Sequence, residues 1–71
     1  MEEQLLAILK RVFKLESIDN TISQESCPQW DSMNHLILVV EIEIEFGCTF
    51  SPEEIAEMKS FASIVNILKS K

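Results

Sequence analysis

The residues of this chain best suited to chemistry lie in one short stretch, Trp30–Leu36, which reads WDSMNHL. Ser32 offers a hydroxyl, Asp31 a carboxylate beside it, and His35 an imidazole three positions on. Nucleophilic catalysis by a serine needs a base within hydrogen-bond reach, but at about 100° per residue His35 would lie on the core side of a helix, about 60° from Ser32. No Gly-x-Ser-x-Gly turn and no nearby lysine replaces it. We therefore expect His35 to be a packing residue and Ser32 to be either an attachment site or a simple helix-start residue.

The two cysteines, Cys27 and Cys48, form no CxxC pair and have no zinc-site spacing with His35, so we expect no metal site. A predicted helix over residues 32–46 would hold them roughly 20 Å apart, since each helical residue adds about 1.5 Å. A disulfide requires Cα atoms within about 7 Å. We expect two free thiols in a reducing compartment.

Length and composition indicate one small domain over residues 1–71, with 46% apolar residues to build its core. So short a chain buries only about 60% of its unfolded surface and has little room for a deep enzymatic cleft. No apolar run approaches the roughly 18 residues that cross a bilayer, and the chain opens with Glu2 and Glu3 instead of a basic leader. We expect a soluble, cytoplasmic protein without membrane insertion.

Charge is distributed unevenly: twelve acidic and six basic residues give a formal net charge of -6, and no lysine or arginine lies between Leu15 and Met58. Such an anionic surface repels nucleic acid and attracts proteins with basic patches. That the acids merely keep a small domain soluble stays open.

The first predicted element is an amphipathic helix over Met1–Leu15, with acids in its first turn and bases in its last. A long loop, Glu16–Gln29, follows, and we expect it to be held to the core at Ile18 and Ile22.

The segment over residues 32–46 is ambiguous, because its EIEIEF portion alternates like a strand and is rich in β-branched residues. Asp31 as an N-cap, a length of about four turns and Gly47 as a stop favour a helix. Two further helices are predicted downstream: a short one at Pro52, with Ser51 and Glu54 as a capping box, and a last one capped by Ser60. The predicted fold is all-α, a small four-helix bundle of three longer helices and one short helix.

The helix over residues 32–46 has two apolar arcs. The arc that we expect to face the core contains His35, Leu38, Val39, Ile42 and Phe46; the second contains Met33, Leu36, Ile37, Val40 and Ile44. So small a domain can hardly cover both. The second arc is either covered by the loop Glu16–Gln29 or free for a partner, and both alternatives stay open.

Asp31-Ser32-Met33 opens an acidic helix after a long loop and before a short helix and a last one, and this arrangement resembles acyl carrier proteins over essentially the whole chain. The motif of that family is Asp-Ser-Leu, with Met33 here in the Leu position. The resemblance also rests on length, helix order, the acidic middle and the EIEIEFG helix end.

The resemblance implies a non-catalytic, cytoplasmic phosphoprotein of lipid or polyketide biosynthesis, monomeric, with Asp31 as the motif neighbour of the modified Ser32. A separate Mg²⁺-dependent phosphopantetheinyl transferase would attach 4′-phosphopantetheine from coenzyme A to Ser32. The arm's thiol would carry an acyl or aminoacyl thioester from a loading ligase to downstream synthase or transferase enzymes. The implied partner contacts are Met33, Leu36, Ile37, Val40, Glu41, Glu43 and Ile44.

The motif residues of this chain differ from those of carriers of primary fatty acid synthesis. Those usually have a Gly at the position of Gln29, an acid at Asn34 and often Glu at the positions of Ile37 and Ile44. Trp30 and His35 look instead like stand-alone carriers of specialised pathways, and Asp-Ser-Met is similar to D-alanyl carriers. One alternative is a non-carrier helical protein-interaction module, in which Ser32 only starts a helix; another, an enzyme using Ser32 or Cys48, lacks a base.

Overall fold

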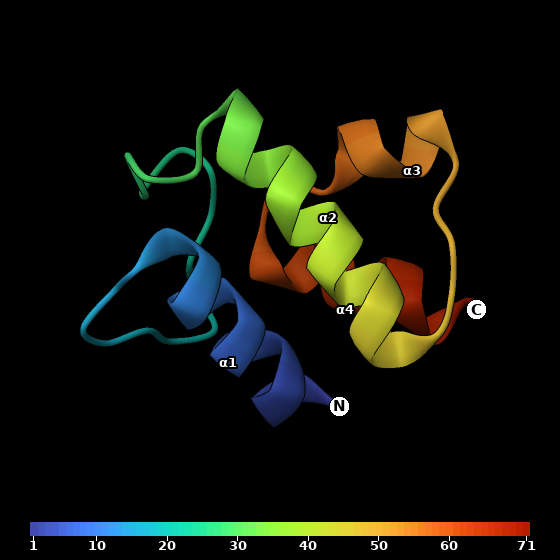
Figure 1. Cartoon of the computed structure of the whole chain (residues 1–71), viewed down its shortest axis with the longest axis horizontal. Helices are drawn as coiled ribbons and strands as arrows, with labels where there is room; N and C mark the ends of the chain where they lie inside the picture. Colours follow the sequence, from blue (N-terminus) through green and yellow to red (C-terminus); the bar gives the residue numbers. More distant parts are fainter.

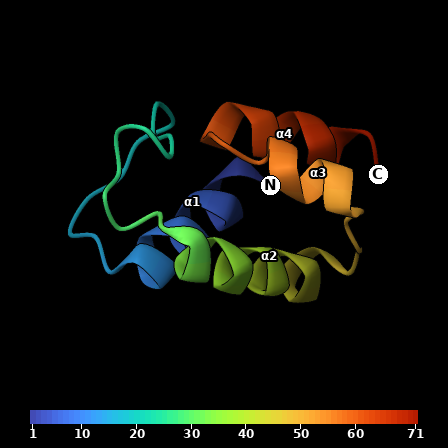
Figure 2. The same cartoon turned by 90° about the horizontal axis from the view of Figure 1, so that it is seen from above.

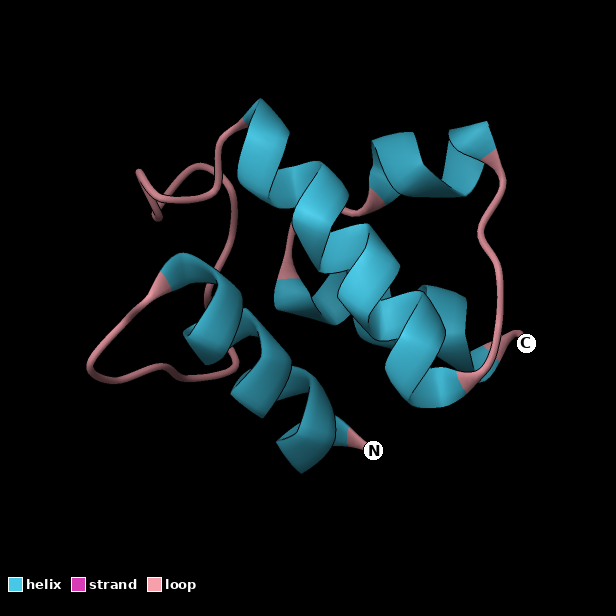
Figure 3. Cartoon of the chain, viewed as in Figure 1, coloured by secondary structure: helices cyan, strands magenta, loops and turns pink.

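The structure, a computed structural model, describes all residues 1–71 and contains four helices and no strand. The helices are α1 (Glu2–Phe13), α2 (Ser32–Phe46), α3 (Pro52–Glu57) and α4 (Phe61–Lys69) (Figure 3). Helices α2 and α4 lie one in front of the other in Figure 1, and α1 and α3 flank them on opposite sides. In Figure 2, which is turned by 90°, α2 lies at the bottom of the view and α4 at the top. The predicted all-α bundle of three longer helices and one short helix is confirmed.

The core lies where these helices meet and consists only of apolar side chains, because no polar or charged residue is fully buried. Its members are Leu5, Ile8, Leu9, Phe13, Cys27, Trp30, Leu38, Val39, Ile42, Phe50, Met58, Phe61, Ile64, Val65 and Leu68. No helix is both long enough and apolar enough to cross a membrane.

Helix α1 is shorter than the predicted Met1–Leu15, because its last turn closes at Lys14. Lys14 adopts the left-handed conformation (φ 55°, ψ 47°), and its N–H donates to the Arg11 carbonyl oxygen. The Leu15 N–H donates to the Lys10 carbonyl oxygen. Glycine is the usual residue at this position, so a lysine gave no stop signal in the sequence.

Helix α2 has the predicted bounds. The Asp31 carboxylate accepts a hydrogen bond from the Asn34 N–H at 2.9 Å, and Gly47 ends the helix in the left-handed conformation (φ 63°). Of the predicted core arc, Leu38, Val39 and Ile42 are buried, whereas His35 and Phe46 are only partly buried. The two end signals therefore outweigh the strand-like alternation between them.

The predicted caps of α3 and α4 are also present. Ser51 and Glu54 form a capping box, with Pro52 as the first helical residue, and Ser60 caps α4 by accepting the Ser63 N–H at 3.1 Å. These caps satisfy N–H groups that have no partner inside a helix.

The loop between α1 and α2 joins the start of α4 through a short antiparallel bridge between Ser23 and Ser60. The Phe61 N–H donates to the Ile22 carbonyl oxygen at 3.0 Å. The loop thus lies away from the exposed face of α2, as Figure 2 shows, and the alternative in which it covers the second apolar arc is wrong.

The loop is anchored more deeply than the sequence indicated. Ile18 and Ile22 do pack against the core, but they are only partly buried. The fully buried anchors are Cys27 and Trp30, and the Trp30 ring packs against Phe13 with ring centroids 5.2 Å apart. The prediction that the two isoleucines alone hold the loop was therefore incomplete.

Candidate functional site

Ser32 is the first residue of α2 and is exposed. Its hydroxyl makes no hydrogen bond within the chain, in contrast to the side chains of Asp31 and Asn34 beside it. The first turn of α2 contains no acidic residue, and its backbone N–H groups point out of the helix end. The position therefore presents a free hydroxyl in a region of positive helix-dipole potential.

The backbone on both sides of Ser32 is held firmly. Besides the Asp31 cap, the Asn34 side-chain amide donates to the Gln29 carbonyl oxygen at 2.8 Å. The His35 N–H donates to the Asp31 carbonyl oxygen, also at 2.8 Å. Ser32 thus lies between two fixed backbone segments while its own side chain stays in solvent.

His35 is a packing residue, as predicted, and both of its ring nitrogens are hydrogen-bonded. Trp30 Nε1–H donates to His35 Nδ1 at 2.9 Å, and His35 Nε2 lies 2.9 Å from the Ile55 carbonyl oxygen. Neither ring nitrogen is therefore free to accept the Ser32 proton. Sequence reasoning missed this linkage, because Ile55 lies 20 residues further along the chain.

The apolar residues predicted to contact partners lie together on one exposed surface of α2, which we name the α2 strip. Its members and their exposed fractions are Met33 73%, Leu36 60%, Ile37 45%, Val40 51% and Ile44 74%. No segment of the chain covers them. An uncovered row of large apolar side chains is typical of a binding surface, and this one begins directly after Ser32.

The acidic residues of α2 differ in how free they are. Arg11 of α1 donates to the Glu41 carboxylate at 2.5 Å, and the partly buried Glu43 accepts the Phe50 N–H at 3.0 Å. Glu45 is exposed and makes no ion pair. Of the two predicted acidic contacts, Glu41 therefore shares its charge with Arg11, and Glu43 holds the loop after α2 in place.

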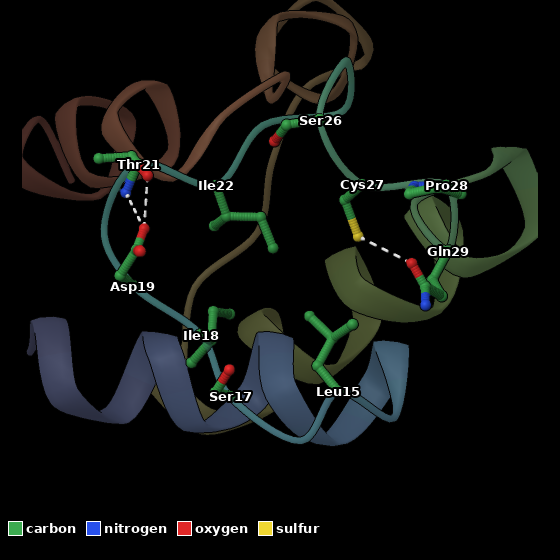
Figure 4. A pocket seen from close by; sticks show the side chains of 10 residues that line it. All are labelled: Leu15, Ser17, Ile18, Asp19, Thr21, Ile22, Ser26, Cys27, Pro28 and Gln29. Atoms are coloured by element: carbon green, nitrogen blue, oxygen red, sulfur yellow. Dashed lines mark hydrogen bonds between the residues drawn. The ribbon is translucent and has the colours of Figure 1, made fainter.

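A cavity of about 420 Å³ lies within the loop that follows α1 and is lined only by residues between Leu15 and Gln29 (Figure 4). Leu15, Ile18, Ile22 and Cys27 point into it. Asp19 stands at its edge, and hydrogen bonds from the Thr21 hydroxyl and N–H lower the pKa of that carboxyl from its ordinary 3.8. Neither Ser32 nor the α2 strip lines this cavity.

The remaining predicted chemistry concerns metals and thiols. No three His, Cys, Asp or Glu side chains are grouped closely enough to hold a metal ion. Cys27 and Cys48 are both free thiols; Cys27 is buried, with its Sγ 3.5 Å from Gln29 Oε1, and Cys48 is partly buried.

No protein-family model matches the chain, and a search of curated proteins finds no relative. The geometry around Ser32 is therefore the basis of the functional interpretation.

Proposed function

We propose that this chain is a carrier protein in which the Ser32 hydroxyl is the attachment point of 4′-phosphopantetheine. The arm, taken from coenzyme A, ends in a thiol that carries an acyl or aminoacyl group as a thioester. The observation that supports this most directly is an exposed, unbonded serine hydroxyl at the first residue of the longest helix, next to an uncovered apolar strip. The proposal includes D-alanyl-type carriers, which use the same attachment.

The electrostatics of the helix start favour such a group. A phosphodiester on Ser32 is an anion at a helix N-terminus, where unpaired N–H groups and the helix dipole stabilise negative charge. No acid within the first turn of α2 opposes it. The carboxylate of the preceding residue, Asp31, lies outside this turn and accepts the Asn34 N–H.

The α2 strip supports the second half of the proposal, the presentation of the cargo to enzymes. A phosphopantetheinyl transferase must reach Ser32, and a loading ligase and a downstream synthase or transferase must bind the carrier to reach its arm; the strip is the apolar surface beside Ser32. Glu45 and the partly exposed Glu41 lie on the same helix and suit partners with basic rims.

The proposal is tested by incubating the protein with coenzyme A, Mg²⁺ and a broad-specificity phosphopantetheinyl transferase, followed by intact-mass measurement. We expect one added arm on the wild type and on Ser17→Ala, which alters another exposed serine, and none on Ser32→Ala. A folded wild type that stays unmodified with several transferases would contradict the proposal.

The uncovered strip also favours a second candidate, a helical protein-interaction module in which Ser32 has no chemical role. The same experiment separates the two, because a module predicts no modification. Binding of its partner would then be unaffected by Ser32→Ala and weakened by Val40→Asp.

A further inference from the structure

The hydrogen bonds of His35 fix one protonation form of its ring. An indole N–H can only donate, so His35 Nδ1 must be the acceptor of the 2.9 Å bond from Trp30. The ring proton of the neutral imidazole then lies on Nε2, where it donates to the Ile55 carbonyl oxygen at 2.9 Å. His35 thus connects Trp30, which lies two positions before Ser32, with helix α3.

Both partners gain a hydrogen bond from His35. The Trp30 side chain is only 3% exposed, and a buried N–H without an acceptor is costly. The Ile55 carbonyl lies in the last turn of α3, where carbonyl groups lack a helical partner four residues on, and it otherwise accepts only the Met58 N–H at 3.3 Å. His35 therefore gives the Trp30 indole N–H its acceptor and gives the Ile55 carbonyl oxygen a second hydrogen bond.

The link is also the one side-chain hydrogen bond between α2 and α3. Helix α3 is six residues long and contributes no fully buried side chain, so packing alone holds it weakly. Apart from its own capping box, α3 makes one further side-chain polar contact, the 2.7 Å ion pair between Glu54 and Lys71, and this pair does not involve α2.

We propose that His35 is the positioning residue of the Ser32 site. It fastens the first turn of α2 to Trp30 on one side and to α3 on the other, while its own N–H bonds to the Asp31 carbonyl oxygen. An enzyme that modifies Ser32 then meets a hydroxyl carried by a fixed backbone, which lowers the entropy lost in reaching the reactive geometry. The significance for modification rests on the proposed carrier function; the mechanical link does not.

The link is tested first on the unmodified protein by NMR. The ¹⁵N shifts of His35 should show the neutral Nε2–H form, with magnetisation transfer from the Trp30 indole proton to the imidazole. A proton on Nδ1, or no contact with the indole, would overturn the proposal. This measurement needs no variant and no transferase.

Variants then test what the link does. His35→Phe keeps a ring but removes both hydrogen bonds, and His35→Gln keeps an N–H donor in place of the imidazole Nε2–H. In His35→Phe we expect the backbone amides of Asn34, of residue 35 and of Met58 to exchange with solvent about ten-fold faster, which corresponds to the loss of one hydrogen bond. In His35→Gln the exchange rates should recover in part. The Ile64 amide, inside α4, is the internal control. Unchanged exchange at α2 and α3 would refute the positioning role.

Modification kinetics supply the functional readout. Because the α2 strip is intact in both variants, the KM of a transferase for the carrier should stay unchanged, and kcat should fall about three- to ten-fold in His35→Phe and recover partly in His35→Gln. Equal kcat values in wild type and His35→Phe would overturn the positioning of Ser32. If the wild type is not modified at all, the carrier proposal fails, and the exchange experiment still decides whether His35 fixes this helix start.

Discussion

At the scale of single residues, the properties of Ser32 come from its neighbours. Asp31 fixes the helix start, Asn34 ties the preceding loop to it, and neither uses the serine hydroxyl. A chemically ordinary serine is thus made accessible by the hydrogen bonds that other residues make around it.

The Asp31 cap leads to a stability prediction. Asp31→Ala leaves the Asn34 N–H without its 2.9 Å acceptor and should lower the free energy of unfolding by about 1 kcal/mol. Asp31→Asn keeps a capping oxygen and should lie close to wild type. Urea denaturation followed by circular dichroism measures both, and equal losses in the two variants would show that charge, not capping, is what Asp31 supplies.

Glu54 leads to a prediction on pH. Hydrogen bonds from the Lys71 ammonium, the larger cause, and from the Ser51 N–H lower the pKa of Glu54 from its ordinary 4.5. A carboxyl with a lowered pKa in the folded state stabilises the fold above its unfolded pKa, and this contribution disappears as the pH falls through the folded value.

In Glu54→Gln, stability should therefore fall less steeply than in wild type as the pH is lowered below about 4.5. Gln retains a capping-box acceptor, and Glu53→Gln, an acid in the same turn that makes no bond to Lys71, is the matched control. Urea midpoints measured across this range test it, and identical slopes for wild type and Glu54→Gln would refute it.

At the scale of elements, α2 has one buried face and one exposed face. Two adjacent valines lie on different faces. Val39 is 4% exposed, whereas Val40 is 51% exposed. Val39→Asp places a charge in the core and should destabilise the fold by about 3 kcal/mol or more. Val40→Asp should leave the fold intact by circular dichroism and, under the proposed carrier function, weaken loading by a partner enzyme by about 1–3 kcal/mol. If Val40→Asp unfolds the protein, the α2 strip belongs to the core.

The same helix shows what a sequence can and cannot predict. Asp31 and Gly47 are local signals, so the bounds of α2 and the separation of its two faces were predictable. The end of α1 at Lys14 was not, because a lysine carries no preference for the left-handed conformation. The bonds from His35 to Ile55 and from Glu43 to Phe50 depend on how distant segments meet, which no local pattern contains.

At the scale of the whole molecule, distant segments are connected mostly by apolar packing and a few polar ties. Arg11 pairs with Glu41 across α1 and α2, and Lys71 pairs with Glu54 while its ammonium lies 5.2 Å from the Phe50 ring centroid. Solvent screens partly exposed pairs of this kind, so they contribute little to stability. The shape therefore depends on the core, and the charges are available for recognition.

The cysteines report on this packing. Cys27 is buried in the core, and burial raises the pKa of the partly exposed Cys48 thiol, which reduces its thiolate. We expect a thiol reagent to modify Cys48 first, more slowly than in the unfolded chain, and Cys27 only after denaturation. Mass spectrometry of the wild type and of Cys48→Ser measures the order. Rapid labelling of Cys27 in the native protein would contradict the packing of the loop.

The placement of Trp30 also gives the molecule an optical property. It is the only tryptophan in a chain without tyrosine, and it is buried against Phe13 two residues before Ser32. Intrinsic fluorescence excited at the red edge of the protein band therefore comes from this one indole. Its emission wavelength and lifetime follow the environment of the helix start, so an event at the serine can be observed in real time without an attached dye.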